Sequence, residues 1–404
     1  MFQDQVIQWA HCMTGTASEV DPVEKHFLLD LAALGRLISA LQARGYQVVG
    51  PQVRDGAVVY DLLDSIQDLP VGWRDEQAPG RYRLEKTGSP SIFGFTVGPH
   101  SWKRFLHPAE ILLFQVAREG SVPQTVPSGA PRYALLGVRA CDLAAIAIQD
   151  RVLTGDRFAE PGYHARRGGA FIVAVQCGAA SASCFCTSMG TGPRAEAGFD
   201  LALTEVTGGD GPAFVLDVGS EAGAEIAGEL KIHKAAAKLV RQAEETVKGA
   251  AAAITRHLDT TGIRDLLYRN FEHARWDDVA ARCLSCANCT LVCPTCFCST
   301  VEDTSDVAGD CAERWRRWDS CFVQSFSYIH GGSVRMSSRS RYRQWLTHKL
   351  ASWIDQFCSS GCVGCGRCIT WCPVGIDITA EVAAIRGAAA PAAKGEPADE
   401  ERDS

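Results

Sequence analysis

Two segments of the chain space four cysteines in the same way. Each follows the pattern C-x2-C-x2-C-x3-C-P, and together they contain Cys283, Cys286, Cys289, Cys293, Cys362, Cys365, Cys368 and Cys372, with Pro294 and Pro373 after the two runs. Three cysteines two residues apart can wrap a short loop around one cubane and bind three of its irons. The doubled pattern therefore predicts two [4Fe–4S] clusters, whose chemistry is one-electron transfer.

The fourth cysteine of each run is expected to serve the other cluster, because the chain turns away after the third ligand in proteins with two such runs. We assign the first cluster to Cys283, Cys286, Cys289 and Cys372, and the second to Cys362, Cys365, Cys368 and Cys293. The alternative is a pair of four-cysteine zinc sites. Zinc motifs usually pair two C-x2-C knuckles and lack this run of three.

The insert between the runs is long, since 69 positions separate Cys293 from Cys362. Apolar residues recur in it at helical spacing, at Trp345, Leu346, Leu350, Trp353, Ile354 and Phe357. This period predicts a helix, and hence a C-terminal α-helical ferredoxin-like domain that binds two [4Fe–4S] clusters. Arg282, Arg367 and the basic residues of the insert either raise the cluster potentials or form a solvated face.

The preceding region reads as an α+β fold with a βαβ unit. In order, we expect a helix over 24–45, a small antiparallel sheet from 46–50 and 57–63, a strand over 133–139, a helix over 142–153, a strand over 170–176, strands over 199–206 and 212–219, and a helical stretch over roughly 221–257. A crossover as long as the one over 142–153 usually makes its two strands parallel.

Four further cysteines gather at the carboxyl edge of that βαβ unit. Cys141 and Cys177 each follow one of the two buried strands, and a glycine-rich segment just beyond adds Cys184 and Cys186. Open α/β sheets place their ligands at this edge. We interpret the four as a third metal site, a further [4Fe–4S] cluster. Buried free thiols and a zinc site remain as alternatives, because no regular spacing supports the group.

Three more thiols follow the first run, at Cys296, Cys298 and Cys321. Cysteines beside clusters can donate hydrogen bonds to cluster sulfur, pack as small apolar residues, or bind another centre. The sequence does not decide among these roles, so the three are candidates for a second layer around the clusters or for a further site.

Composition narrows the class of protein. The chain has 404 residues, 18 cysteines and a formal net charge of −7, so nothing in the charge balance favours nucleic acid as a partner. No signal peptide, apolar span, dinucleotide fingerprint or P-loop is readable. We expect no membrane insertion and a cytoplasmic location, where so many thiols indicate metal or redox chemistry. The expected domains are 1–270, 271–386 and a disordered tail over 387–404.

Several motifs together resemble one family. They are CPTCFC at 293–298, WDSC at 318–321, HK at 348–349, GCVGCGRCITWCPVGID at 361–377, SWKRFLHPAEILLF at 101–114, GVRACDLAAI at 137–146 and C-x6-CFCTSMGTGP at 177–193. The chain is similar over most of its length to the iron–sulfur β subunit of soluble NAD(P)-linked nickel–iron hydrogenases (sulfhydrogenases), and to the related electron-transfer subunit of anaerobic sulfite reductase. The family's two-cluster cysteines map onto the eight assigned above.

The resemblance implies an electron-transfer subunit without a catalytic centre of its own. It would relay electrons between a flavin subunit that binds NAD(P)H and the small and large subunits of a nickel–iron hydrogenase. Anaerobic sulfite reductase is the alternative complex. A free-standing thiol, disulfide or polysulfide reductase is a second hypothesis, which needs an exposed low-pKa thiolate. An iron–sulfur redox sensor is a third, and no basic recognition helix supports it.

Overall fold

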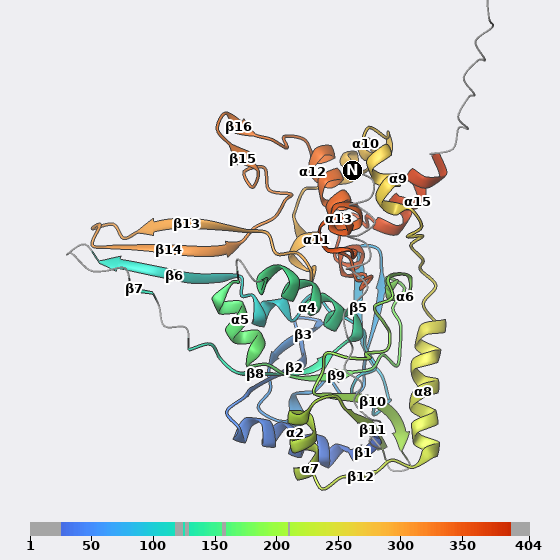
Figure 1. The fold of residues 1–404 in the computed structure, drawn as a ribbon. Helices are drawn as coiled ribbons and strands as arrows, with labels where there is room; N and C mark the ends of the chain where they lie inside the picture. Colours follow the sequence, from blue (N-terminus) through green and yellow to red (C-terminus); the bar gives the residue numbers. More distant parts are fainter. Residues whose placement is uncertain (1–25, 118–123, 126–128, 156–158, 209–210, 389–404) are drawn as a thin grey trace, which may run out of the picture.

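The structure is a computed structural model, and it describes residues 26–117, 124–125, 129–155, 159–208 and 211–388. An eight-stranded mixed sheet forms the lower body of the molecule (Figure 1). Its strand order is β12 (His233–Lys234), β1 (His26–Asp30), β11 (Gly211–Val218), β10 (Leu201–Gly208), β9 (Phe171–Val175), β8 (Tyr133–Val138), β2 (Gln47–Arg54) and β3 (Ala57–Leu62). The four central strands β10, β9, β8 and β2 are mutually parallel, and the outer pairs are antiparallel.

Helices cover both faces of this sheet because the central strands are buried on both sides. Leu136, Val173 and Leu203 pack with α2 (Leu31–Ala43) and α7 (Glu221–Glu229) on one face. Leu135 and Ile172 pack with α4 (Ala140–Leu153) and α5 (Pro161–Gly168) on the other. The predicted βαβ unit is therefore present: β8 and β9 are parallel and α4 and α5 lie between them in the chain.

Two local predictions are wrong in their bounds, and a third is wrong about the sheet to which a hairpin belongs. Residues 24–45 do not form one helix, because His26–Asp30 is strand β1, and Asp30 caps α2 by accepting a hydrogen bond from the backbone of Ala33 at 2.6 Å. The stretch over 221–257 is divided into α7, β12 and α8 (Ala237–Ala252). The hairpin of β2 and β3 is antiparallel as expected, but β2 joins the large sheet through β8 instead of forming a small sheet of its own.

The C-terminal region is mainly helical. It contains α9 (Ile263–Arg269), α10 (Arg275–Arg282), α11 (Asn288–Leu291), α12 (Ser338–Thr347), the π-helix η2 (His348–Ser352), α13 (Trp353–Phe357), α14 (Arg367–Thr370) and α15 (Ile378–Ala388). Trp276, Trp345, Leu346 and Ile385 form its buried core. The helix expected across the insert is present as the continuous series α12, η2 and α13. Almost all of the expected tail lies outside the described residues.

A four-stranded sheet projects from the body as an arm (Figure 1). It contains β13 (Ser299–Ser305), β14 (Cys311–Trp318), β6 (Glu110–Ala117) and β7 (Gln124–Thr125). The pairing of β14 with β6 joins the insert to the N-terminal region. A second hairpin, β15 (Tyr328–Ile329) and β16 (Gly332–Ser333), extends above the arm.

The remaining short elements are β4 (Trp73–Ala78), β5 (Arg81–Lys86), α3 (Lys103–Leu106), α6 (Cys186–Met189) and a 3-10 turn over Ile66–Asp68. Within the described part of the chain, no helix is both long and apolar enough to span a membrane.

Candidate iron–sulfur site

The two cysteine runs adopt the same backbone conformation. The residue two positions after the first cysteine is left-handed in both, with φ of 51° at Ser285 and 65° at Gly364. The residue four positions after the first cysteine is left-handed as well. It is Ala287 in the first run and Gly366 in the second, and the short helix α11 or α14 begins directly after it. A left-handed Ser or Ala costs roughly 1–2 kcal/mol. The loop therefore holds its curved form even where the side chain disfavours it.

Backbone amides point at sulfur in both loops. The amide of Ser285 donates to Cys283 Sγ at 3.4 Å, and that of Gly364 donates to Cys362 Sγ at 3.5 Å. The amide of Ile376 donates to Cys372 Sγ at 3.3 Å. Hydrogen bonds of this kind favour the thiolate and are among the interactions that set cluster potentials.

The first three cysteines of run one share a pocket with the last cysteine of run two. Its sulfur-bearing wall contains Cys283, Cys286, Cys289, Cys368 and Cys372. The rest of the lining is mainly apolar and includes Phe322, Tyr342, Trp345, Ile376 and Ile378. The geometry brings Cys372 to the first run, as crossed ligation requires.

The other four cysteines of the two runs lie close together as well. Burial raises the pKa of Cys362 to about 12, with further contributions from the neighbouring thiols Cys365 and Cys293. Burial likewise raises the pKa of Cys368, and the thiols Cys362, Cys365 and Cys293 add to it. Such buried thiols fit a metal-bound role, because binding to iron stabilises the thiolate that burial disfavours.

Helices α11 and α14 bring the two cysteine groups together. Asn288 Nδ2 donates to the carbonyl of Trp371 at 3.1 Å, so the start of one motif helix is hydrogen-bonded to the end of the other. Cys368 belongs to the second group and also lines the pocket of the first. The two sites are therefore neighbours.

Two buried lysines, Lys103 on α3 and Lys349 on η2, reach the same region. Lys349 Nζ donates to Cys293 Sγ at 3.2 Å, and Lys103 Nζ donates to the carbonyl of Cys296 at 3.1 Å. Lys103 also lies 4.0 Å from the centroid of the Trp318 ring. Within the described ranges, neither lysine forms an ion pair with a carboxylate. A buried ammonium needs a compensating anion, and the cluster-type thiolates would supply it. The residues present thus fit anionic iron–sulfur clusters.

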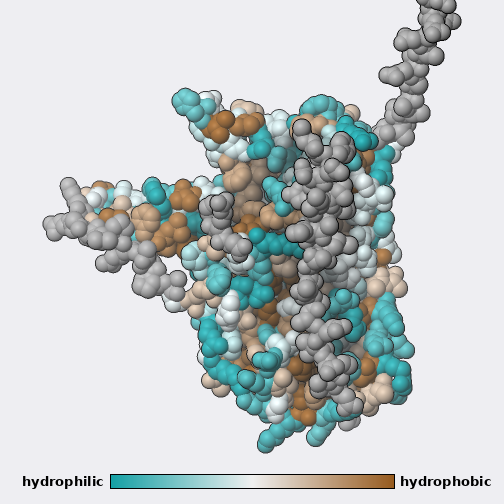
Figure 2. Space-filling view, viewed as in Figure 1, coloured by the Kyte–Doolittle hydropathy of each residue, from teal (hydrophilic) through white to brown (hydrophobic). Residues whose placement is uncertain are grey.

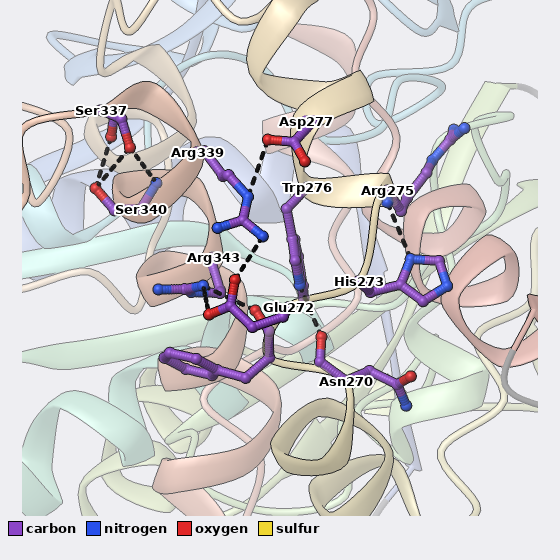
Figure 3. Close-up of polar contacts among 11 residues, drawn as sticks. Asn270, Glu272, His273, Arg275, Trp276, Asp277, Ser337, Arg339, Ser340 and Arg343 are labelled. Carbon is purple, nitrogen blue, oxygen red and sulfur yellow. Dashed lines mark hydrogen bonds and ion pairs between the residues drawn. The ribbon is translucent and has the colours of Figure 1, made fainter.

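The basic residues noted in the sequence are mostly neutralised by carboxylates. Arg339 pairs with Glu272 at 2.8 Å and with Asp277 at 2.9 Å, and Arg343 pairs with Glu272 at 3.0 Å (Figure 3). These contacts fasten α12 to α10 and to the segment before it. They favour the structural interpretation of the basic insert over a direct effect on the clusters.

Arg282 and Arg367, beside the cysteines, are also paired. Arg282 contacts Glu381 at 2.8 Å. Arg367 is fully buried and donates both of its terminal nitrogens to Asp142, at 2.8 and 3.1 Å. This bidentate pair fixes the second loop to the first turn of α4.

The four cysteines predicted as a third site lie beside the second group. Burial, together with the nearby thiols of Cys184, Cys177 and Cys365, raises the pKa of Cys186 to about 12. Cys141, in the first turn of α4, is packed with Cys186, Cys365 and Trp353. The structure therefore gathers Cys177, Cys184 and Cys186 and places Cys141 next to them.

Among the residues that the structure describes, no three His, Cys, Asp or Glu side chains are arranged to hold a single metal ion. A cubane does not need that convergence, because each thiolate binds a different iron.

Cys296, Cys298 and Cys321 lie close to the two cysteine groups, in two places. Cys296 donates a hydrogen bond to Cys293, which belongs to the second cysteine group. Cys321 donates to Cys298, and this hydrogen bond, together with the charges of Lys349 and Lys103, lowers the pKa of Cys298 to about 7. The backbone supports this second pair, since the amide of Asp319 donates to the carbonyl of Cys298 at 2.8 Å.

Sequence reasoning missed the two lysines. Lys349 lies in the HK dipeptide and Lys103 in the SWKRF segment, both within motifs that carried the family resemblance. A lone lysine has no spacing signal, and its burial is a property of the fold. The family motifs were the signal that could have drawn attention to them.

The comparisons with known proteins agree with this site. The model of the 4Fe-4S dicluster domain matches residues 282–376. Sulfhydrogenase 2 subunit beta of Pyrococcus furiosus is 34% identical over 278 residues, which is 68% of this chain and 79% of the relative. No solved structure matches the chain significantly. By its sequence and its cluster domain, this chain belongs to the sulfhydrogenase beta-subunit family.

Proposed function

We propose that the chain is the electron-transfer iron–sulfur subunit of a cytoplasmic NAD(P)-linked nickel–iron hydrogenase complex, relaying electrons between a flavin subunit and the hydrogenase subunits. The observation that carries the proposal is the contact between the two cysteine groups through Cys368 and the paired helices α11 and α14. Bound [4Fe–4S] clusters supply one-electron transfer. The chain's own residues hold the two sites side by side.

Crossed ligation is part of this proposal. The first cluster takes Cys283, Cys286, Cys289 and Cys372, and the second takes Cys362, Cys365, Cys368 and Cys293. The pocket lining supports it, since Cys372 lies with the first run. In anaerobically purified protein, Cys372→Ser is expected to damage the cluster that Cys286→Ser removes and to spare the other. Loss of the cluster that depends on Cys365 would contradict the assignment.

We also propose a third [4Fe–4S] cluster at Cys141, Cys177, Cys184 and Cys186. The proximity of Cys186 to Cys365 supports it, because a cluster there would adjoin the second one and extend the electron path. Iron analysis should then give about twelve irons per chain, against about eight for two clusters. A Cys184→Ser variant that loses no iron would leave these residues as buried free thiols.

The surface beside the first cluster is suited to a protein partner. Cys286 is exposed, and Leu284, on the same loop, is 63% exposed. Ser338, close in the chain to Met336, meets the loop, and its Oγ lies 2.8 Å from Ser285 Oγ. Met336 is 64% exposed. Apolar side chains also gather on the β15–β16 hairpin nearby (Figure 2). Electrons enter or leave most readily where a cluster is close to a partner surface.

The experiment that tests the whole proposal is an anaerobic pull-down of the tagged chain from its host, with partners identified by mass spectrometry. Nickel–iron hydrogenase subunits together with a flavoprotein are the expected result. A sirohaem subunit in their place would assign the chain to anaerobic sulfite reductase. Recovery of the chain without any partner protein, and with its clusters intact, would contradict the subunit role.

A second candidate function is thiol or polysulfide reduction at Cys298 and Cys321. The hydrogen bond between these thiols, and the lowered pKa of Cys298, favour a reactive thiolate at this place. The isolated chain would then reduce polysulfide, and Cys298→Ser would abolish that activity with both clusters retained. Wild-type chain without such activity would remove this candidate.

A further inference from the structure

Lys349 is held against the second cysteine group from three directions. Its Nζ donates to Cys293 Sγ at 3.2 Å, to Thr295 Oγ1 at 2.8 Å and to the carbonyl of Gly361 at 3.3 Å. These three acceptors use all three donors of an ammonium. Gly361 directly precedes Cys362, so the side chain touches both loops that supply ligands to the second cluster.

The backbone of Lys349 fixes the same neighbour. Its carbonyl accepts from the amide of Gly361 at 2.8 Å and from Ser360 Oγ at 3.3 Å. Thr295 completes the arrangement by donating to the carbonyl of Gly361 at 2.8 Å. Lys349 is only 4% exposed, so its ammonium cannot turn away into solvent.

Lys349 lies on the π-helix η2, between α12 and α13. Single-turn π segments are rare and occur frequently at functional sites. Here the wide turn lies where one continuous helical series passes the second cluster site. The core side chains Trp345, Leu350 and Trp353 remain buried on either side of Lys349.

We propose that Lys349 is a positioning residue that raises the reduction potential of the second cluster above that of the first. This inference rests on the proposed presence of the second cluster. A fixed positive charge that donates a hydrogen bond to a ligand sulfur stabilises the reduced state, which carries one more negative charge.

The charges of the two arginines beside the cysteine runs are compensated by carboxylates, and Lys103, the other buried lysine of this region, donates to the carbonyls of Cys296 and Leu291 and not to a sulfur. Arg367 forms a bidentate pair with Asp142, and Arg282 pairs with Glu381. Lys349 is the cation that meets ligand sulfur directly, and it has no carboxylate partner among the described residues. The uncompensated charge of Lys349 therefore lies beside the second cluster. An electron shared between the two clusters then resides mainly on the second one.

The test is a redox titration of the full-length anaerobic protein, followed by electron paramagnetic resonance, after its iron content has been measured. Lys349→Met removes the charge and keeps most of the side-chain length. We expect the ratio of reduced to oxidised second cluster to fall at least tenfold at a given potential, which is ~59 mV for one electron. The first cluster should change much less. Lys349→Arg should retain most of the wild-type potential, because it keeps the charge.

Arg282→Gln is the matched control, since it removes a paired, partly exposed cation beside the first cluster and should move neither potential by more than a small fraction of that shift. The shifted signal is identified as the second cluster if Cys365→Ser abolishes it and Cys286→Ser does not. If Lys349→Met loses the cluster, Lys349→Gln replaces it as the test. That change removes the charge but keeps a polar side chain that can donate a hydrogen bond, and should lower the same potential by less.

Unchanged potentials in Lys349→Met or in its substitute, with full iron content, would overturn the inference, and so would equal shifts of both clusters. Wild-type protein without the second cluster would instead overturn the proposed function, so the two failures are distinguishable.

Discussion

The buried side chains of His107 and Arg316 connect the arm, which is the four-stranded sheet, to the body of the molecule. His107 follows α3, and its carbonyl accepts a hydrogen bond from Trp318 Nε1 at 2.9 Å. Its ring lies 2.6 Å from a terminal nitrogen of Arg316 on β14. Burial, together with the charge of Arg316, lowers the pKa of His107 to about 3. The imidazole is therefore neutral in the folded protein over the ordinary pH range.

This neutrality predicts acid sensitivity with a definite sign. The unfolded chain takes up a proton at His107 near pH 6.5, whereas the folded chain does so only near pH 3. Stability from this group is complete above about pH 6.5 and is lost as the pH falls between those values. Between pH 6.5 and 5 the loss should be about 2 kcal/mol.

The measurement is the fall in melting temperature between pH 7 and pH 5 under anaerobic conditions. It should be smaller in His107→Gln than in the wild type. His233→Gln, which changes an exposed histidine, should keep the wild-type fall. Equal falls in all three proteins would show that His107 does not govern this response.

At the scale of elements, the loop of the second cysteine run is seated on the segment before α6. The amide of Phe185 donates to the carbonyl of Gly364 at 2.8 Å. Thr370 Oγ1 hydrogen-bonds to Ser183 Oγ at 2.8 Å. A Cβ built on Gly364 would lie 2.6 Å from the carbonyl oxygen of Phe185, so the approach leaves no room for a side chain.

Gly364→Ala should therefore weaken the second cluster. The substitution combines a left-handed backbone, at φ of 65°, with a clash against backbone atoms that cannot move aside cheaply. We expect partial or complete loss of that cluster's iron, and little change in the first, measured by iron analysis and electron paramagnetic resonance.

Gly309→Ala is the matched control. Gly309 has φ of 70° and open space around its Cβ position, so alanine there adds backbone strain of roughly 1–2 kcal/mol without a clash. Its iron content should match the wild type. Equal iron loss in both variants would mean that strain, and not the close approach, explains the effect.

At the scale of the molecule, the N-terminal and C-terminal regions interlock at several places. Strand β6 pairs with β14, Asp142 on α4 pairs with Arg367, and Gln149 on α4 donates to the carbonyl of Pro294. The second cysteine group is enclosed by both regions. The first is enclosed mainly by residues of the C-terminal core.

A fragment of residues 253–388 should therefore hold one cluster and not two. It retains the core around the first pocket, including Ile263 and Leu267 of α9. It lacks Asp142 and the 183–186 segment that support the second loop. We expect about four irons per fragment, with the signal that depends on Cys286 retained. A fragment that binds about eight irons would establish the C-terminal region as an independent domain, as the sequence-based boundaries predict.

The sequence by itself determined the features that depend on short spacing. Eight cysteines in two runs of identical spacing specify the type of cofactor. Cysteines separated by only two or three residues must lie on one loop, whatever the rest of the fold is. The βαβ unit was readable for the same reason, since buried strands and an apolar helix between them leave a local pattern. The family followed from the same motifs.

The tertiary structure alone decided what depends on distant contacts. Residues 26–30 became a strand because β11 pairs with them, although their apolar pattern continues that of the helix. Arg367 received its charge partner from a position 225 residues away. Lys349 was placed on the sulfur of Cys293 by the packing of η2 against both loops. Burial and charge compensation arise from the whole fold, so no local spacing could reveal them.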